Sequence, residues 1–318
     1  MMKGQQELGV KGGYSLRVFK EDGAEVKEKY IPFVQNVVTN FGIVHEVFDR
    51  LLDGRVKVIV GTGTNSITQT STGLGSRLLG TDSTNESATS LTHADNGNGT
   101  VTSTGVFNRS FAIGDFNGES ISEVGLEEGF SSDFVAGQLI KDSGGSPTTI
   151  TILSDEQLIV EYVIEVTSWF TRQELATLNV TVNGVTTTAR LKINPYLRDS
   201  NLANNSVDTI ISDPDIRDVT FFDSTAAGIF DVGNTGSGSM TVSSGVATMA
   251  FSHTFSPSLF NSTDIKYVAI GQGWTGADVT DPFQGRHAFV LVFDTPIEKT
   301  SSQAMTIDFS VDITATQA

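Results

Sequence analysis

Two short acidic segments are the first residues in this sequence whose types and spacing could do chemistry. Each spaces carboxylate or amide side chains closely: GDFNGE holds Asp115, Asn117 and Glu119, and SDPDIRD holds Asp213, Asp215 and Asp218. Oxygen ligands in such a pattern can bind a hard cation such as Ca²⁺, but neither segment matches a full calcium-binding loop. Asp and Asn are also common residues of β-turns. We interpret both segments as turns.

The side-chain patterns typical of enzymes are absent from the sequence. The four histidines share no metal-ligand spacing; they are His45, His93, His253 and His287. No G-x-S-x-G or H-E-x-x-H motif occurs, and GTGTNS, which follows VKVIV, lacks the Lys-Ser/Thr of a phosphate loop. We therefore expect no catalytic residue, no cofactor and no metal site, and we predict that the chain is not an enzyme.

Aromatic side chains offer one further kind of chemistry, the stacking of sugar rings. The chain has two tryptophans and five tyrosines: Trp169, Trp274, Tyr14, Tyr30, Tyr162, Tyr196 and Tyr267. Trp274, in GQGWTGAD, has the most loop-like surroundings and is the candidate glycan contact. The alternative is an ordinary core or interface aromatic, because such side chains bury large apolar areas in both places.

Composition narrows the class of protein. The chain has 318 residues, with 20 basic against 37 acidic side chains and a formal net charge of −17. That balance disfavours binding to a phosphate backbone, so we expect no direct contact with nucleic acid. There is no cysteine, which excludes disulfides and thiol chemistry. The N-terminus lacks the apolar stretch of a secretory signal, and no apolar run is long enough to span a bilayer.

Two blocks of similar pattern, residues 121–167 and 265–314, contain the strongest strand signals. Each begins with I-x-x-V-x-[IL], passes a glycine-bearing loop and an apolar run (LIKD and VLVFD), and ends in a long alternating strand. The apolar faces of the two strands are Leu158, Val160, Tyr162, Ile164 and Val166, and Met305, Ile307, Phe309, Val311 and Ile313. Alternation of this length indicates half-buried antiparallel strands. We expect the acidic residues to face solvent or a partner.

Similarity between the blocks predicts a partial duplication. TSTGVFNRSF and SSGVATMAF share [ST]-x-G-V-x-x-x-x-F, which extends the repeat towards the N-terminus. The high Gly, Ser, Thr and Asn content favours short strands joined by turns. The predicted fold is therefore all-β and mainly antiparallel, with two similar β-sandwich-like modules and one short N-terminal helix.

Other local signals complete the predicted organisation. Residues 1–168 form an N-terminal β-module, with an arm at 1–13, a strand at 14–19, a D-G turn and a returning strand at 26–34. A helix near 40–52, capped by Thr39 or Asn40, precedes a long loop at 61–100. Residues 169–215 form a connection, with a short helix or turn at 169–178, an N-G hairpin at 180–193 and a linker. Residues 216–318 form a C-terminal β-module resembling 100–167.

Several short motifs also resemble a known family. QNVVTNFG before a helix, VIVGTGT, ISEVGL, and GQLIKDSGGSPTTITILSDEQLIVEYVIEV resemble structural proteins of tailed-bacteriophage virions, of the tail-fibre or tail-collar type. The resemblance covers residues 31–167. It implies a strand at 121–126 and a turn at 142–147 that leads into the closing strand. The loop 61–100 and the whole of 168–318 depart from the family pattern.

The resemblance and the composition together indicate a non-enzymatic structural subunit of a tailed-phage virion. It would belong to the tail, a fibre or the head–tail region, be assembled in the host cytoplasm and be released by lysis. Its partners would be copies of itself and other virion proteins, with no membrane insertion. Two alternatives stay open: a receptor- or carbohydrate-binding fibre domain that contacts a host surface glycan through Trp274, and a capsid decoration protein.

Overall fold

The structure is a computed structural model that describes twelve stretches of the chain. They are residues 8–44, 56–78, 89–128, 133–169, 173–182, 185–193, 216–225, 228–232, 237–243, 246–258, 262–272 and 287–317. Within these stretches the fold is all-β and mainly antiparallel, with one short α-helix, α1 (Asn40–Val44), and a 3-10 turn, η1 (Lys27–Lys29). The predicted fold class is confirmed, while the sandwich-like form of the modules stays a prediction.

The first half of the chain builds two sheets. One has the order β2-β1-β11-β6-β5, and the other β3-β9-β8-β4. The strands of the first sheet are β1 (Leu8–Lys20), β2 (Ile31–Gln35), β5 (Ser90–Asp95), β6 (Thr100–Ser110) and β11 (Glu156–Trp169). Those of the second are β3 (Val37–Val38), β4 (Val56–Gly61), β8 (Glu123–Glu128) and β9 (Phe134–Leu139), and a small ladder joins β7 (Ser120–Ile121) to β10 (Ile150–Thr151).

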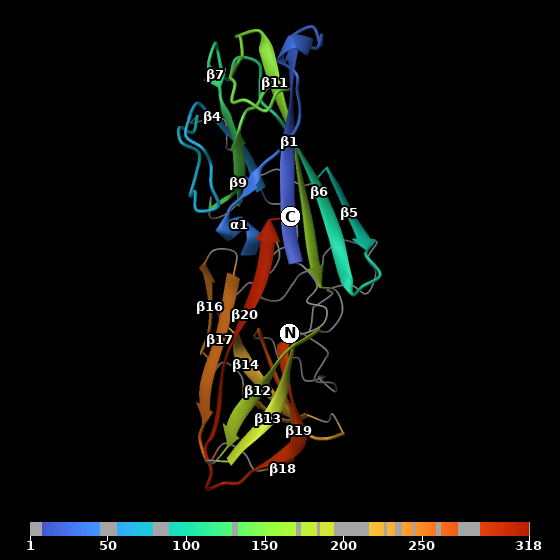
Figure 1. Cartoon of the computed structure of the whole chain (residues 1–318), viewed down its shortest axis with the longest axis vertical. Coiled ribbons are helices and arrows are strands. Elements are labelled where there is room, and N and C mark those ends of the chain that lie inside the picture. Colours follow the sequence, from blue (N-terminus) through green and yellow to red (C-terminus); the bar gives the residue numbers. More distant parts are fainter. Residues whose placement is uncertain are drawn as a thin grey trace.

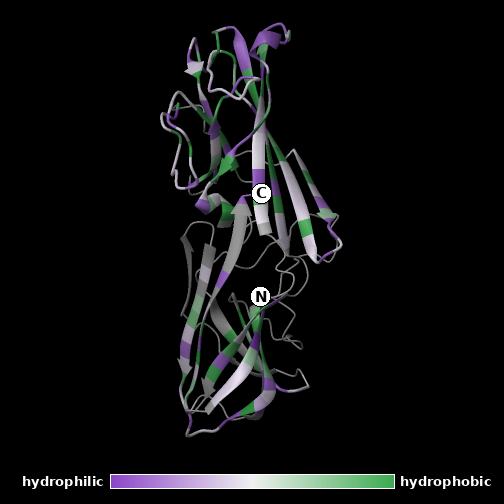
Figure 2. Ribbon diagram, viewed as in Figure 1, coloured by the Kyte–Doolittle hydropathy of each residue, from purple (hydrophilic) through white to green (hydrophobic). Residues whose placement is uncertain are grey.

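Alternation of side chains puts the core between these two sheets. On β11, Leu158, Val160, Tyr162, Ile164 and Val166 are buried, as predicted from their spacing. They share one apolar cluster with residues of β8 and β9, so each sheet buries one face against the other. Figure 2 shows hydrophilic and hydrophobic residues alternating along the strands, and hydrophilic residues gathered at the far end of this half. Burial of the apolar faces is the main driving force of such a fold.

Nine strands are found among the described residues of the second half. They are β12 (Gln173–Val182), β13 (Val185–Ile193), β14 (Ile216–Phe222), β15 (Gly228–Val232), β16 (Ser237–Ser243), β17 (Val246–Phe255), β18 (Ser262–Gln272), β19 (His287–Lys299) and β20 (Met305–Gln317). One run has the order β15-β14-β18-β19-β13-β12, and another β16-β17-β20. As predicted, Met305, Ile307 and Phe309 of β20 are buried, while Thr306 and Asp308 are exposed.

Strand pairing shows that the second half repeats the topology of the first. β6 pairs with β11 as β17 pairs with β20, and β4, β8 and β9 pair in series as β14, β18 and β19 do. The hairpin of β1 and β2 corresponds to that of β12 and β13, and β3 meets β9 as β13 meets β19. We call residues 8–169 the first module and 173–317 the second module.

This correspondence corrects the predicted organisation. Residues 173–193 were expected in a connection, but β12 and β13 belong to the second module because they pair with β20 and β19. The predicted short helix or turn at 169–178 is wrong for Trp169, which ends β11, and for 173–178, which begin β12, while residues 170–172 lie outside the described residues. The N-G hairpin is confirmed by the pair Val182–Val185, and the linker 194–215 lies outside the described residues.

Other predictions fail at the ends of elements. The expected N-terminal arm is wrong for residues 8–13, which form the start of β1, and the expected loop 61–100 ends early because β5 lies within it. The shared [ST]-x-G-V pattern does not mark equivalent places, since Gly105 lies within β6 opposite Ile164 while residues 244–245 fall between β16 and β17. The two short motifs match in sequence, whereas the structural equivalence of two strands depends on which strands they pair with.

The short helix is confirmed where it is described. Thr39 Oγ1 accepts a hydrogen bond from the backbone N–H of Gly42 at 3.0 Å, which is the predicted N-cap. Residues 45–52 of the predicted helix lie outside the described residues. Within the described ranges, no helix has the length and apolar character needed to cross a membrane.

The two modules lie end to end, and α1 sits where they meet (Figure 1). The end of β20 pairs in parallel with the start of β1, with Leu8 opposite Ala315 and Val10 opposite Gln317. The helix contacts β9 of its own module and β16 and β20 of the second module. Because backbone pairing crosses the boundary, the two modules share one 14-stranded sheet.

Candidate functional site

A buried carboxylate in the first module anchors a long surface loop. Glu123 of β8 is 0% exposed. Its Oε1 accepts hydrogen bonds from the backbone N–H groups of Gly63 at 2.9 Å and Ser76 at 2.8 Å, and its Oε2 accepts one from Gly75 at 3.0 Å. A buried charge is costly unless it is paired or hydrogen-bonded, and here backbone dipoles solvate it. We call Glu123 with residues 62–78 the Glu123 loop anchor.

Two glycines make room for this carboxylate. A Cβ added at Gly61 would lie 2.4 Å from Glu123 Oε1, and one at Gly63 would lie 2.5 Å from the same atom. Any side chain at either position would displace the carboxylate. The motifs VIVGTGT and ISEVGL are therefore two halves of one feature, because the glycines of the first leave space for the glutamate of the second.

The anchored loop folds back on the sheet and exposes polar side chains. Backbone hydrogen bonds from Thr62 N to Ser76 O and from Leu78 N to Val60 O close its base. Ile67 and Leu74 pack against Ile59 in a small apolar cluster. Exposed positions between these contacts carry mainly Ser, Thr, Asn and Gln, at residues 64–66 and 68–70. The loop thus displays a fixed polar surface suited to contact with another molecule.

An ion pair lies beside the anchor. Arg77 Nη1 contacts Glu127 Oε1 at 2.9 Å, and the Glu127 side chain is only 5% exposed. Both Glu123 and Glu127 were expected to face solvent or a partner. That expectation is wrong because the loop 62–78 covers the outer face of β8, so every residue of this strand is buried.

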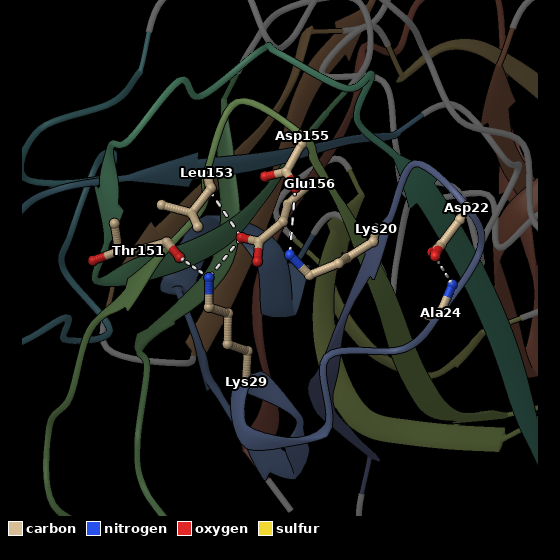
Figure 3. A network of polar contacts seen from close by, with 8 residues as sticks. All are labelled: Lys20, Asp22, Ala24, Lys29, Thr151, Leu153, Asp155 and Glu156. Atoms are coloured by element: carbon tan, nitrogen blue, oxygen red, sulfur yellow. Dashed lines mark hydrogen bonds and ion pairs between the residues drawn. The ribbon is translucent and has the colours of Figure 1, made fainter.

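A polar network ties together the end of the first module that lies farthest from the second (Figure 3). Lys29 Nζ donates to the carbonyl of Thr151 at 2.7 Å and to Glu156 Oε2 at 2.5 Å, and Lys20 pairs with Asp155 at 3.3 Å. Burial by itself raises the pKa of Glu156. The Leu153 N–H and the Lys29 and Lys20 ammonium groups outweigh it and lower that pKa below its ordinary value.

Two exposed aliphatic side chains lie near this network. Ile113 is 43% exposed and Leu153 is 44% exposed, and their loops are joined by a hydrogen bond from Gly118 N to Ile152 O at 2.7 Å. Single exposed apolar residues are common on protein surfaces. Here the fixed ion pairs and the aliphatic pair occur together, so this end of the molecule is a second candidate contact surface.

A third cluster lies at the junction of the modules. Gln317 Nε2 donates to the backbone carbonyl of Asn36 at 2.8 Å, and the Asn36 side chain donates to the hydroxyl of Tyr162. Tyr14 donates to the carbonyl of Leu139 at 2.9 Å and so links the two sheets. Burial raises the pKa of both tyrosines, which therefore stay neutral. These contacts couple the last residues of the chain to the first module's core.

The predicted acidic turns are partly confirmed. In GDFNGE, Asp115 Oδ2 accepts the backbone N–H of Ala112 at 2.8 Å, and Asn117 and Gly118 have positive φ values of 41° and 94°. This segment is a turn, as predicted. In SDPDIRD, Asp213 and Asp215 lie outside the described residues, and the turn interpretation is wrong for Asp218, whose backbone is in β14.

The candidate histidines and aromatics do not converge. His93 Nδ1 contacts Ser103 Oγ at 2.8 Å, and burial lowers its pKa; His253 packs against Phe255, with ring centroids 4.5 Å apart. Within the described stretches, no group of three metal-ligating side chains forms. His45, Tyr196 and Trp274 lie outside them, so the glycan contact at Trp274 stays a prediction.

Comparison with known proteins adds no further assignment. No protein-family model, no curated protein and no solved structure matches this chain. The Glu123 loop anchor is the feature that sequence reasoning missed. Its signal is a glutamate inside an apolar strand run, ISEVGL, together with the glycines of VIVGTGT. The candidate surfaces therefore rest on the geometry described above.

Proposed function

We propose that the chain is a non-enzymatic structural subunit of a tailed-phage virion, in the tail, a fibre or the head–tail region. It acts by assembly: copies of the chain and other virion proteins contact its surfaces, and the subunit reaches the particle in the host cytoplasm. The proposal joins the family resemblance of residues 31–167 to the construction of the fold.

One observation carries this proposal more than any other. The two modules are joined by backbone pairing between β1 and β20, with the side-chain bond of Gln317 to Asn36 beside it. Three consecutive backbone pairs cross the boundary between the modules. Bending at the boundary would have to break these pairs, whereas a flexible linker would bend without losing any. An elongated unit of fixed length suits a part that sets distances within a particle.

The anchored surfaces support the same function. The Glu123 loop anchor and the Lys29–Glu156 network hold loops in place through hydrogen bonds within the chain. Preformed surfaces lose less conformational entropy on association, which strengthens binding. The formal net charge of −17 favours basic partner surfaces over nucleic acid.

Native mass spectrometry of the purified chain tests the proposed assembly. We expect a discrete oligomer, held by interfaces that each bury on the order of 2,000 Å². A variant with Asp or Lys at both Ile113 and Leu153 tests whether the far end of the first module forms part of the oligomer interface. If it does, the substitutions should lower the oligomer fraction without unfolding the chain. A chain that stays monomeric alone and with its particle proteins would contradict the proposal.

Two other functions remain as alternatives. A receptor- or carbohydrate-binding fibre domain would use Trp274, and glycan-array binding that is lost in Trp274→Ala would support it. A capsid decoration protein would share the same surfaces and differ in its place on the particle. The backbone junction between modules favours neither of these over a tail or fibre subunit.

A further inference from the structure

The outer face of β1 and β2 in the first module carries two exposed aromatic rings. Phe33 is 58% exposed and Tyr30 is 43% exposed. A Cβ added at Gly13 of β1 would lie 2.3 Å from Phe33 Cζ, so this glycine leaves the space in which the ring lies. The guanidinium of Arg17 lies over the Tyr30 ring, 6.0 Å from its centroid. We call Arg17, Tyr30 and Phe33 the aromatic patch, whose two rings lie against the sheet and face solvent.

A face of the opposite character lies on β17 and β20 of the second module. By register, Ser252 lies opposite Asp308 and Thr248 opposite Asp312, and Thr248 Oγ1 donates to Asp312 Oδ1 at 2.6 Å. The sequence from 218 to 265 and from 300 to 318 contains no Lys or Arg. We call the exposed side chains of these strands, which are hydroxyls and carboxylates, the acidic face: Ser252, Thr254, Thr306, Asp308, Ser310 and Asp312.

The patch and the acidic face are complementary in hydrogen bonding and in length. The guanidinium of Arg17 only donates hydrogen bonds, whereas the carboxylates of Asp308 and Asp312 only accept them. Four residues separate Gly13, under Phe33, from Arg17 along β1, and four separate the two aspartates along β20. Each arrangement therefore extends about 13 Å along its strand. Aromatic residues and Arg are also the side chains that protein interfaces favour.

We propose that the aromatic patch of one copy of the chain packs on the acidic face of a second copy. Face-to-face sheets pack about 10 Å apart with their strands nearly aligned. In this contact Arg17 donates to the carboxylates of β20, and the rings of Tyr30 and Phe33 shield that ion pair from water. An ion pair that is shielded in this way is stronger than one in bulk water.

The two surfaces must come from different copies. They lie in different modules, which are arranged end to end and joined by backbone pairing (Figure 1). One chain therefore cannot bring its own patch onto its own acidic face. A contact between unlike surfaces leaves each copy with a surface for the next one, so the contact repeats and builds a ring or a filament. This inference rests on the proposed assembly of copies and names the surfaces that meet.

Charge reversal on each side tests the contact. One variant, Arg17→Glu, gives the patch the sign of the acidic face, and the other, Asp308→Lys with Asp312→Lys, gives the face the sign of the patch. All three positions are exposed, so both variants should fold, which circular dichroism checks. Each variant alone should self-associate at least about tenfold more weakly than the parent in sedimentation velocity, because like charges then meet.

A third variant controls for net charge. Lys141→Glu changes the net charge by the same amount as Arg17→Glu, and it lies in the segment after β9, outside both surfaces. We expect it to associate as the parent does. Loss of association in this control equal to that of Arg17→Glu would overturn the contact, since total charge and not the patch would then govern assembly.

Mixing the two reversed variants tests whether these surfaces meet each other. The reversed patch of the first variant matches the reversed face of the second, and the native patch of the second matches the native face of the first. An equimolar mixture should therefore restore most of the parent's association, with both masses alternating in native mass spectra. A variant that had merely unfolded would not be rescued by mixing.

The outcomes separate this inference from the proposed function. A parent oligomer that neither reversal weakens would overturn the inference and leave the proposed assembly standing, and weakening without rescue by the mixture would overturn the pairing of these two surfaces. A parent that stays monomeric alone and with its particle proteins would overturn both. A monomeric parent that binds polygalacturonate, with binding lost in Arg17→Glu, would overturn the second copy as the occupant in favour of an acidic polysaccharide.

Discussion

At the scale of single residues, the clearest structural role belongs to the carboxylate of Glu123. Three backbone N–H groups from two turns of the loop 62–78 converge on it, and Gly61 and Gly63 leave it space. Hydrogen bonds to a charged acceptor are stronger than those between neutral groups. Glu123 therefore fixes a loop that has few apolar contacts of its own.

Replacing Glu123 by Gln tests this role. The amide of Gln has one acceptor oxygen, and its NH₂ group takes the place of the second carboxylate oxygen. That NH₂ group would face backbone N–H donors of the loop and leave them without an acceptor. We expect unfolding to become easier by about 2–4 kcal/mol, since each orphaned buried donor costs about 1–3 kcal/mol. Urea unfolding measures the change, with the exposed Glu119→Gln as the control, and equal midpoints for both variants would refute the anchor.

Stability at acidic pH tests the network around Glu156. Its folded-state pKa is lowered, so its contribution is fully present above the ordinary pKa of 4.5 and is lost as pH falls through the folded pKa. We expect Glu156→Gln to be less stable than the parent at neutral pH, with the difference shrinking below pH 4.5. Thermal unfolding measured across that range checks this, and a difference that grows towards low pH would count against it.

Sequence patterns predict some of these residues and miss others. The alternation of apolar and polar residues places Val160 and Tyr162 in the core correctly. A strand with one buried face has an apolar residue at every second position. The same reasoning places Glu123 on an open face, since the pattern of one strand carries no information about a loop that later covers it. Pairing between Gly63 and Glu123 crosses 60 residues and follows from no local propensity.

At the scale of elements, the two modules share an arrangement but not the same side chains. By pairing register, Gly61 opposite Glu123 in the first module corresponds to Phe222 opposite Tyr267 in the second. Phe222 lies in an apolar cluster against which Tyr267 packs, whereas Glu123 is a buried carboxylate. A duplicated fold whose two copies have diverged would show this combination of similar strand pairing and different side chains.

Truncation after Thr314 tests the junction of the modules. It removes the three backbone pairs of Ala315–Gln317 with β1 and the bond from Gln317 to Asn36. We expect one calorimetric transition in the parent and two in the truncated chain, because the modules lose their shared ladder. Gln317→Ala alone should cost only about 1 kcal/mol and keep one transition. A single transition after truncation would show that other contacts couple the modules.

Local signals predict hairpins better than they predict modules. The N-G pair between β12 and β13 indicates a hairpin, and Val182 does lie opposite Val185. The hairpin's place in the second module depends instead on pairs such as Leu191 with Leu291, which are a hundred residues apart in sequence. Long-range pairs of this kind leave no periodic signal, so the sequence places this hairpin in a connection, whereas the structure pairs it with β19.

At the scale of the whole molecule, the backbone junction and the anchored loops give an elongated unit with fixed loop surfaces. The chain carries its polar loop, its network at the far end and its module junction at different places along its length (Figure 1). In the proposed assembly, a unit of this form would meet several neighbours at once. Its formal net charge of −17 favours neutral or basic neighbours in that assembly, and high salt should weaken the contacts with basic ones.

A cryo-EM map of the intact phage particle to which we propose that this chain belongs tests the proposed function most directly. The proposal predicts symmetric copies of the chain in a ring or fibre of the tail or head–tail region. Interfaces between neighbours should involve the loop 62–78 or the far end of the first module. Particles that contain no density for this chain would contradict it.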